Sequence, residues 1–530
     1  MVRTSPTPPG NASTPAEPRL FGHPPGLFLL FAVEMWERFS YYGMRGLLVL
    51  YLIASTAGDA EGFNPGRGWS KPEASTLYGW YTGLAYLFPI LGGIIADKLI
   101  GTHRSMLVGG LLISIGHVVL AVSGLGSMAH DHVGMTVFIA GLALIVLGTG
   151  HFKPSVSVMV GQLYPQGDPR RDAAFTIFYM GINLGAFLCA FICGTLGEEV
   201  GWHWGFGSAA VGMVAGLLLY LFLRPRYLAN VGLPPEGRGG SAAAFVVASL
   251  LLAAAFGYAY HQGWLVMVQR ALTPGLMGLL AVVVTGLVVW FVAIQRPEDR
   301  GPTASIFLFM VFNVFFWIAF EQAGSSINVF TEQNTDRRLF GTEVPATWFQ
   351  SVNAGLIFLL APLFAGLWTR LGRWHLDPSQ PLKIALGLGF LGIGYVFMVW
   401  AGLQTGGGGK ASMALILLTY LWHTVGELCV SPTGLSYVTK VAPKRFVSLL
   451  MGVWFISSFI ANLAGGLIAA QVEAVERGEI RLPWRFGGQA DFFFLFVVSS
   501  LAMGLVVAVF TPLLTRLIQG RDRADGPAAP

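Results

Sequence analysis

Seven ionisable side chains lie inside long apolar stretches of this 530-residue chain, and these residues are the ones that could do chemistry. An ionisable group in the hydrocarbon core of a membrane is costly, so it normally faces a partner or a water-filled cavity and marks a path for ions, protons or charged solutes. The seven are Glu34, Glu37, Arg38, Arg45, Lys153, Glu321 and Glu427. The sequence therefore predicts a polar cavity within a membrane protein.

The first apolar stretch carries a stripe of polar residues. Glu34, Arg38, Tyr41, Tyr42 and Arg45 fall at offsets 0, 4, 7, 8 and 11, which form one face of a helix with about 3.6 residues per turn. Acids surround Arg38 at one end of this stripe, whereas Arg45 stands alone at the other end, where a substrate anion could bind. The alternative is a salt-bridge staple that only fixes helix packing.

The seven embedded groups carry a net charge of −1 if all of them ionise. At least one carboxyl is therefore expected to be protonated in some state or to face a cationic ligand. Burial disfavours the charged form of a carboxyl, which suits such groups to carrying protons. For Glu427 two roles remain open, a proton site and a site for an ammonium group.

Membrane-spanning helices must position these groups. Hydrophobic residues make up 54% of the chain and charged residues 11%, against about 25% charged residues in a soluble protein. With a mean hydropathy of +0.64, the chain cannot be a soluble multidomain protein, a disordered scaffold, a disulfide-stapled secreted domain or a nucleic-acid binder. Cys189, Cys193 and Cys429 lie in apolar runs and are predicted to be packing residues.

Apolar stretches of about 20 residues, the length that crosses a bilayer, recur along the chain. We place them near 27-54, 76-98, 105-125, 133-160, 172-196, 203-223, 243-261, 275-295, 304-330, 346-370, 382-403, 411-440, 446-470 and 491-516. The predicted fold is an all-α integral membrane protein with fourteen transmembrane helices.

The spans divide into two groups of six and an inserted pair. We expect a disordered cytoplasmic tail at 1-26, a six-helix bundle at 27-223, a linker with two extra transmembrane helices at 224-302, a second six-helix bundle at 303-516 and a cytoplasmic tail at 517-530. Lys and Arg number 20 in the connections on the side of the N-terminus and 9 in the others, so both termini are expected in the cytoplasm. The chain is expected to be a multi-pass protein of the plasma membrane, or of the inner membrane in a bacterium.

The polar stripe resembles a family signature. The segment E-M-W-E-R-F-S-Y-Y-G-M-R, from Glu34 to Arg45, is similar to the ExxERFxYY motif of the proton-dependent oligopeptide transporter (POT) family, a branch of the major facilitator superfamily. Four more segments in both halves resemble superfamily or family motifs, namely Gly93 to Arg104, Phe178 to Gly185, Phe316 to Gln322 and Gly426 to Ser436. The resemblance implies the major facilitator fold, with six helices, two inserted helices and six more, and proton-coupled import of di- and tripeptides by alternating access.

The resemblance also implies roles for single residues. Arg45 and Lys153 are expected to hold a peptide's carboxylate and Glu427 its ammonium. Proton coupling is expected to use Glu34, Glu37, Arg38 and Glu321, the last pairing with Arg45 when substrate is absent. Further substrate-binding positions are Tyr42, Tyr81, Tyr86, Asn183, Trp317, Asn353, Trp454, Phe455 and Ser458, and a cytoplasmic gate is expected at Asp97 and Arg104. For each aromatic residue the alternative is ordinary packing, and Lys153 could instead be a snorkelling cation.

Other functions remain open alongside peptide import. A histidine that animal relatives carry on the second helix is replaced by Gly79, so proton coupling cannot rest there. A transporter of nitrate or another organic anion is possible, although Glu427 argues against it because an anion has no ammonium. A non-transporting nutrient sensor is a third hypothesis. A membrane enzyme is not expected, because the sequence contains no HExxH or GxSxG motif. We expect no cofactor beyond the proton gradient, no metal, no nucleic-acid partner, and a monomer whose partners are peptides, protons and lipid.

Overall fold

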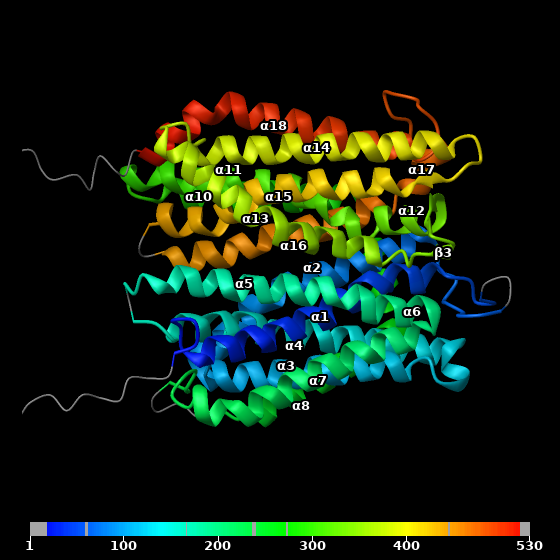
Figure 1. Ribbon diagram of the computed structural model, residues 1–530, viewed down its shortest axis with the longest axis horizontal. Helices are drawn as coiled ribbons and strands as arrows, with labels where there is room; N and C mark the ends of the chain where they lie inside the picture. Colours follow the sequence, from blue (N-terminus) through cyan, green and yellow to red (C-terminus); the bar gives the residue numbers. More distant parts are fainter. Residues whose placement is uncertain are drawn as a thin grey trace, which may run out of the picture.

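Long helices run side by side along the length of this molecule (Figure 1). The computed structural model describes residues 19–58, 62–165, 167–235, 240–271, 274–443 and 446–519. Most of the two predicted tails, 1-18 and 520-530, lies outside the described residues. Both described chain ends lie at one end of the bundle, and the short helices α6, α12 and α17 lie at the opposite end.

The first half of the chain forms seven α-helices and three short turns of other helix types. Its elements are α1 (Pro25–Ile53), α2 (Lys71–Ile95), η1 (Ala96–Ile100), α3 (Thr102–Val122), η2 (Gly126–Ala129), α4 (His132–Gln162), α5 (Arg170–Cys189), η3 (Ala190–Gly194), α6 (Thr195–Glu199) and α7 (Trp202–Tyr227). Because η1 and η3 are single π-helical turns, α2 and α5 continue through them as one crossing each.

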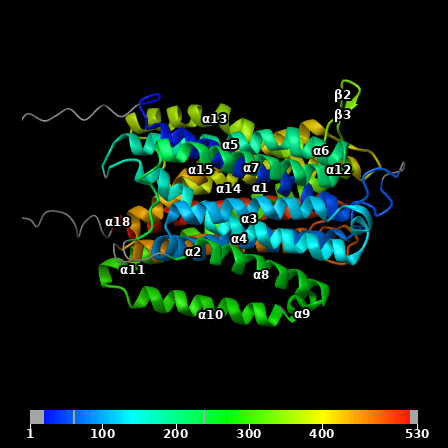
Figure 2. The same cartoon turned by 90° about the horizontal axis from the view of Figure 1, so that it is seen from below.

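The linker and the second half contain the remaining elements. The linker forms α8 (Ala242–His261), α9 (Trp264–Ala271) and α10 (Pro274–Ala293), which lie together on one flank of the bundle (Figure 2). After it come α11 (Pro297–Phe320), η4 (Glu321–Gly324), α12 (Ser326–Asn334), α13 (Trp348–Arg373), α14 (Gln380–Thr405), α15 (Met413–Val441), α16 (Val447–Ala469), α17 (Val472–Glu476) and α18 (Ala490–Gln519). Two small sheets pair β1 (Thr335–Asp336) with β4 (Ala411–Ser412) and β2 (Arg338–Leu339) with β3 (Thr342–Glu343).

Local sequence signals explain where several helices begin. Ser70 caps α2 in a capping box with Glu73, and Asp131 accepts a hydrogen bond from Gly134 at the start of α4. Between their ends, the helices pair most of their backbone polar groups internally, which a lipid environment requires. Prolines such as Pro89 in α2 and Pro154 in α4 interrupt this pairing, because proline has no backbone N–H.

The described residues contain twelve helical segments that are long and apolar enough to cross a membrane. They correspond to twelve of the predicted spans, so the all-α membrane fold is confirmed. The other two predicted spans are α1, whose apolar run is interrupted by the charged stripe, and α10, which contributes the shorter apolar stretch Gly278–Ala293. The full count of fourteen crossings stays a prediction for these two helices, as does the division into five domains.

The two halves of the chain bury separate cores. The largest apolar cluster draws only on residues from Ile306 to Leu514, whereas most of the other clusters come from the first half and α8. The most extensive contacts between helices of opposite halves are those of α2 with α16 and of α5 with α13. The end that holds α6, α12 and α17 also carries polar contacts between the halves, and we call it the closed end.

Candidate functional site

The acidic cluster on α1 surrounds one guanidinium. Arg38 Nε lies 3.1 Å from Glu34 Oε1 and 2.5 Å from Glu37 Oε2, and all three side chains are buried. The Arg38 guanidinium also lies 5.2 Å from the ring centre of Tyr41. Two carboxylates thus share one cation, so the cluster keeps a negative charge unless it takes up a proton.

Arg45, further along the same stripe, reaches across to the second half of the chain. Its Nη2 forms an ion pair with Glu321 Oε2, and its Nε donates a hydrogen bond of 2.6 Å to the Tyr78 hydroxyl. Glu321 is the first residue of the 3-10 turn η4, which follows directly on α11 where that helix ends at Phe320. Both charged side chains are buried, so water cannot readily replace either partner. The structure therefore brings together the two residues that the family resemblance pairs.

Lys153 on α4 has an aromatic partner. Its Nζ lies 4.1 Å from the ring centre of Tyr86 on α2, a cation–π contact. Within the described part of the chain, no carboxylate forms an ion pair with this ammonium. Lys153 can therefore still offer its charge to an anion.

Glu427 on α15 is held by an amide. Asn353 Nδ2 on α13 lies 2.8 Å from Glu427 Oε2 and 3.0 Å from Thr424 Oγ1, one turn earlier on α15. Glu427 is buried, with 7% of the residue's surface exposed. Because Asn353 supplies one hydrogen-bond donor and an ionised carboxylate can accept several, Glu427 keeps capacity for a cationic partner.

Arg45 and Glu427 line the same cavity, which has a volume of about 220 Å³. The predicted site residues on its wall are Tyr42, Arg45, Tyr86, Asn183, Trp317, Glu321, Asn353 and Glu427. Because Arg45 comes from the first half and Glu427 from the second, the cavity has a positive and a negative side chain contributed by opposite halves. This arrangement is complementary to a small molecule with a negative group and a positive group at its two ends.

Five predicted substrate-binding residues do not lie on the wall of this cavity: Lys153, Tyr81, Trp454, Phe455 and Ser458. Lys153 instead contacts the ring of Tyr86, which does line the cavity. Tyr81 stacks on Tyr41 at a ring distance of 6.4 Å, and Trp454 is buried in the core cluster of the second half. Their proposed contacts with substrate stay predictions.

The predicted gate residues lie at the end of the bundle where the described chain begins and ends. Asp97 is in η1 and Arg104 is in the first turn of α3, and both are exposed. Arg104 Nη1 lies 3.5 Å from the carbonyl oxygen of Gly240 in the linker. Among the described residues the two side chains do not form an ion pair with each other, and the gate stays a prediction.

Sequence reasoning missed several residues of the site. Tyr420 and His423 precede Glu427 by seven and four positions and also line the cavity; this helical spacing places them on the face that carries the carboxylate and could have revealed them. Tyr78, which holds Arg45, gave no such signal because it is one of several tyrosines on α2.

The described residues combine twelve helical segments that are long and apolar enough to span a membrane with a cavity lined by charges from both halves of the chain. This is the architecture of a secondary transporter. Residues 103–482 match the POT family, and the chain belongs to this family.

Similar proteins match this chain over nearly its whole length. The peptide transporter YePEPT of Yersinia enterocolitica is 38% identical over 88% of this chain and 91% of its own. A di-/tripeptide transporter of Lactococcus lactis subsp. cremoris is 35% identical over 95% of this chain and 98% of its own. Among solved structures, a peptide transporter POT in complex with sulfate is 34% identical, covers 95% of this chain and 97% of its own, and has a TM-score of 0.76. A POT family transporter in complex with 5-aminolevulinic acid is 30% identical, covers 94% and 98%, and has a TM-score of 0.77.

Proposed function

We propose that this protein is a proton-coupled symporter that imports di- and tripeptides by alternating access. Membership of the POT family and the names of its relatives support this function. The observation that carries it is the pair of opposite charges, Arg45 and Glu427, on the wall of one cavity.

Arg45 and Glu427 would each bind one end of a peptide. A free peptide has a carboxylate at one end and an ammonium at the other, so Arg45 with Lys153 would bind the first and Glu427 the second. Recognition by the two ends leaves the side chains to a cavity wall with several aromatic residues, among them Trp317 and Tyr86. This division favours broad specificity for short peptides.

A switch in the pairing of Arg45 would couple protons to peptides. While Glu321 is ionised it competes with a peptide carboxylate for Arg45, because the two buried residues are already paired. Protonating Glu321 removes its charge and frees Arg45 for the peptide. The acids around Arg38, which share one cation, would take part in the same proton transfer.

The remaining features of the proposal concern the setting of the protein. We place it as a monomer in the plasma membrane, or in the inner membrane of a bacterium, with both termini in the cytoplasm. The proton gradient supplies the energy, so no cofactor, metal or nucleic acid takes part. Asp97 and Arg104 would act at the cytoplasmic gate, and the closed end would face the outside.

Transport of nitrate or of an organic anion is the second candidate. Arg45 and Lys153 would suit an anion, but a buried carboxylate at the other side of the cavity would repel it. Asn353 keeps Glu427 oriented by a hydrogen bond, which supports a role for this carboxylate in binding a cation.

Uptake of radiolabelled dialanine into proteoliposomes tests the proposal. The purified protein should accumulate dialanine when an inward proton gradient is imposed and should only equilibrate it without the gradient. Failure of correctly inserted protein to move any of several dipeptides would overturn peptide transport. Nitrate and organic anions would then be assayed in the same vesicles, and failure with all of them would favour a sensor.

A further inference from the structure

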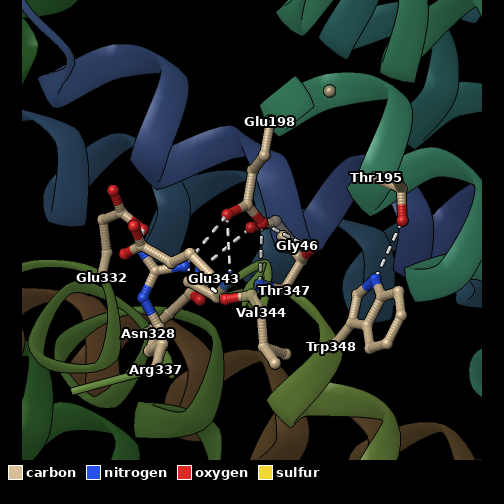
Figure 3. A network of polar contacts seen from close by, with 12 residues as sticks. Gly46, Thr195, Glu198, Asn328, Glu332, Arg337, Glu343, Val344, Thr347 and Trp348 are labelled. Atoms are coloured by element: carbon tan, nitrogen blue, oxygen red, sulfur yellow. Dashed lines mark hydrogen bonds and ion pairs between the residues drawn. The ribbon is translucent and has the colours of Figure 1, made fainter. Parts of the chain in front are cut away.

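Helix α13 begins at the closed end without a cap of its own. Its N-cap residue, Thr347, makes no side-chain hydrogen bond to the helix, although Thr347 and Gln350 match the spacing of a capping box. Glu198 on α6, in the other half, binds the backbone immediately before the helix (Figure 3). Its carboxylate accepts hydrogen bonds of 2.8 Å from Ala346 N, 2.9 Å from Thr347 N and 2.6 Å from Thr347 Oγ1.

Arg337 supports the same carboxylate. Its Nη1 lies 3.8 Å from Glu198 Oε2, and its Nη2 lies 2.9 Å from both Glu332 Oε2 and Glu343 Oε1. The side chains of Glu198 and Arg337 are 10% and 7% exposed, so water screens these contacts only weakly. An anion at a helix N-terminus is favoured both by the unpaired N–H groups and by the helix dipole.

Further contacts tie the start of α13 to the first half. Trp348 Nε1 donates a hydrogen bond of 2.9 Å to Thr195 Oγ1, and Ser351 Oγ donates one of 2.9 Å to the carbonyl oxygen of Phe187. Two residues later α13 carries Asn353, which binds Glu427. The contacts that close this end therefore also fix the helix that orients a carboxylate of the cavity.

We infer that Glu198 is the latch that holds the two halves together at the closed end by binding Ala346 and Thr347, at the start of α13, across their interface. This inference rests on the proposed alternating-access function. The N–H groups of Trp348, Phe349 and Gln350 are bonded to carbonyl oxygens of the preceding turn and do not depend on Glu198. When the halves separate, the groups that lose Glu198 are therefore Ala346 N, Thr347 N and the Thr347 hydroxyl. Water can take its place at the opened end.

Spin-label distances across the closed end test the latch without relying on transport. We would place labels at Trp204→Cys on α7 and Phe340→Cys in the turn between β2 and β3, both strongly exposed, after replacing the three native cysteines by alanine. Double electron–electron resonance would then compare the labelled parent with Glu198→Gln, Glu198→Ala and the control Glu199→Gln, which removes the neighbouring exposed carboxylate.

The latch predicts a clear difference between the two glutamates. Glu198→Ala should raise the ratio of long to short distances roughly tenfold, the equivalent of about one hydrogen bond to a charged group, and Glu198→Gln by less. Thr347→Val, which removes one of the three hydrogen bonds, should have an intermediate effect and serves if Glu198→Ala does not fold. An unchanged distribution in a monodisperse Glu198→Ala protein, or an equal shift in Glu199→Gln, would overturn the inference. If the Glu198 variants shift the distances as expected but the wild-type protein moves no peptide, the latch stands and the proposed function is contradicted.

Discussion

Arg45 of α1 and Glu321 of η4 form a buried ion pair although 276 positions separate them in the chain. The pair joins the two halves of the bundle and lies on the wall of the cavity that also contains Glu427. An anion that enters this cavity must therefore compete with Glu321 for the guanidinium. The proton coupling that we propose depends on this competition.

Replacing Glu321 should separate substrate exchange from proton-driven accumulation. In Glu321→Gln the side chain keeps its shape but no longer carries a charge or a transferable proton, so Arg45 is always available to a peptide. We expect exchange of labelled for unlabelled dialanine across the vesicle membrane to persist while accumulation driven by a proton gradient is lost. The control is Glu479→Gln, a carboxylate that is 62% exposed. Gradient-driven accumulation by Glu321→Gln at the wild-type level would contradict the proposed switch.

Glu427 should determine the preference for a free amino terminus. In Glu427→Gln the amide oxygen can still accept the hydrogen bond from Asn353, so the local structure is kept while the negative charge is lost. We expect the KM for dialanine to rise roughly tenfold to a hundredfold, since a hydrogen bond to a charged group contributes about 1.5–3 kcal/mol. N-acetylated dialanine, which lacks the ammonium, should be transported equally poorly by both proteins. If the variant still prefers dialanine as strongly as the wild type does, Glu427 is not the ammonium site.

Lys153 should act on the other end of the peptide. Lys153→Met keeps an apolar stem against the ring of Tyr86 but removes the charge. We expect the preference for dialanine over its C-terminal amide to fall about tenfold, the loss of roughly 1.4 kcal/mol of charge-assisted binding. Lys410→Met, in an exposed loop, should leave the preference unchanged. An unchanged preference in Lys153→Met would favour the snorkelling interpretation.

The sequence predicted the charged residues of the site more completely than the neutral ones. Arg45 and Glu427 stand out because a charge within an apolar helix needs a reason, and their helices could be placed by length and hydropathy alone. Trp454 and Phe455 carry no such signal. Apolar residues occur all around α16, and its few polar residues do not mark a single face. The sequence therefore does not fix the rotation of α16 about its axis, and its packing against α2 decides it.

Contacts across the interface between the halves could not be predicted from the sequence, for a different reason. Glu198 lies near the end of a predicted span, where an acid needs no special explanation, and its partners Ala346 and Thr347 are almost 150 positions away. Only the arrangement of the two halves brings them together. The same holds for the close approach of Gly79 on α2 and Gly466 on α16.

This approach of two glycines should limit what residue 466 can be. A Cβ atom at Gly466 would lie 2.5 Å from Gly79 Cα and 2.6 Å from the carbonyl oxygen of Ser75, so the two backbones would have to separate. We expect Gly466→Ala to lower dialanine uptake about tenfold, because overpacking typically costs about 1–3 kcal/mol. The adjacent Gly465→Ala, whose Cβ would meet nothing closer than 3.4 Å, should transport normally. Equal activity of the two variants would show that α2 and α16 do not need this contact.

Proton movement driven by a peptide gradient tests the central claim most directly. Proteoliposomes that contain a pH-sensitive dye, and start with equal pH inside and outside, would be mixed with dialanine while the membrane potential is clamped. We predict that the lumen acidifies as dialanine enters, and that it does not acidify with N-acetyl-dialanine amide or with the Glu321→Gln variant. Entry of dialanine into wild-type vesicles without any acidification would contradict the claim that this cavity couples protons to peptides.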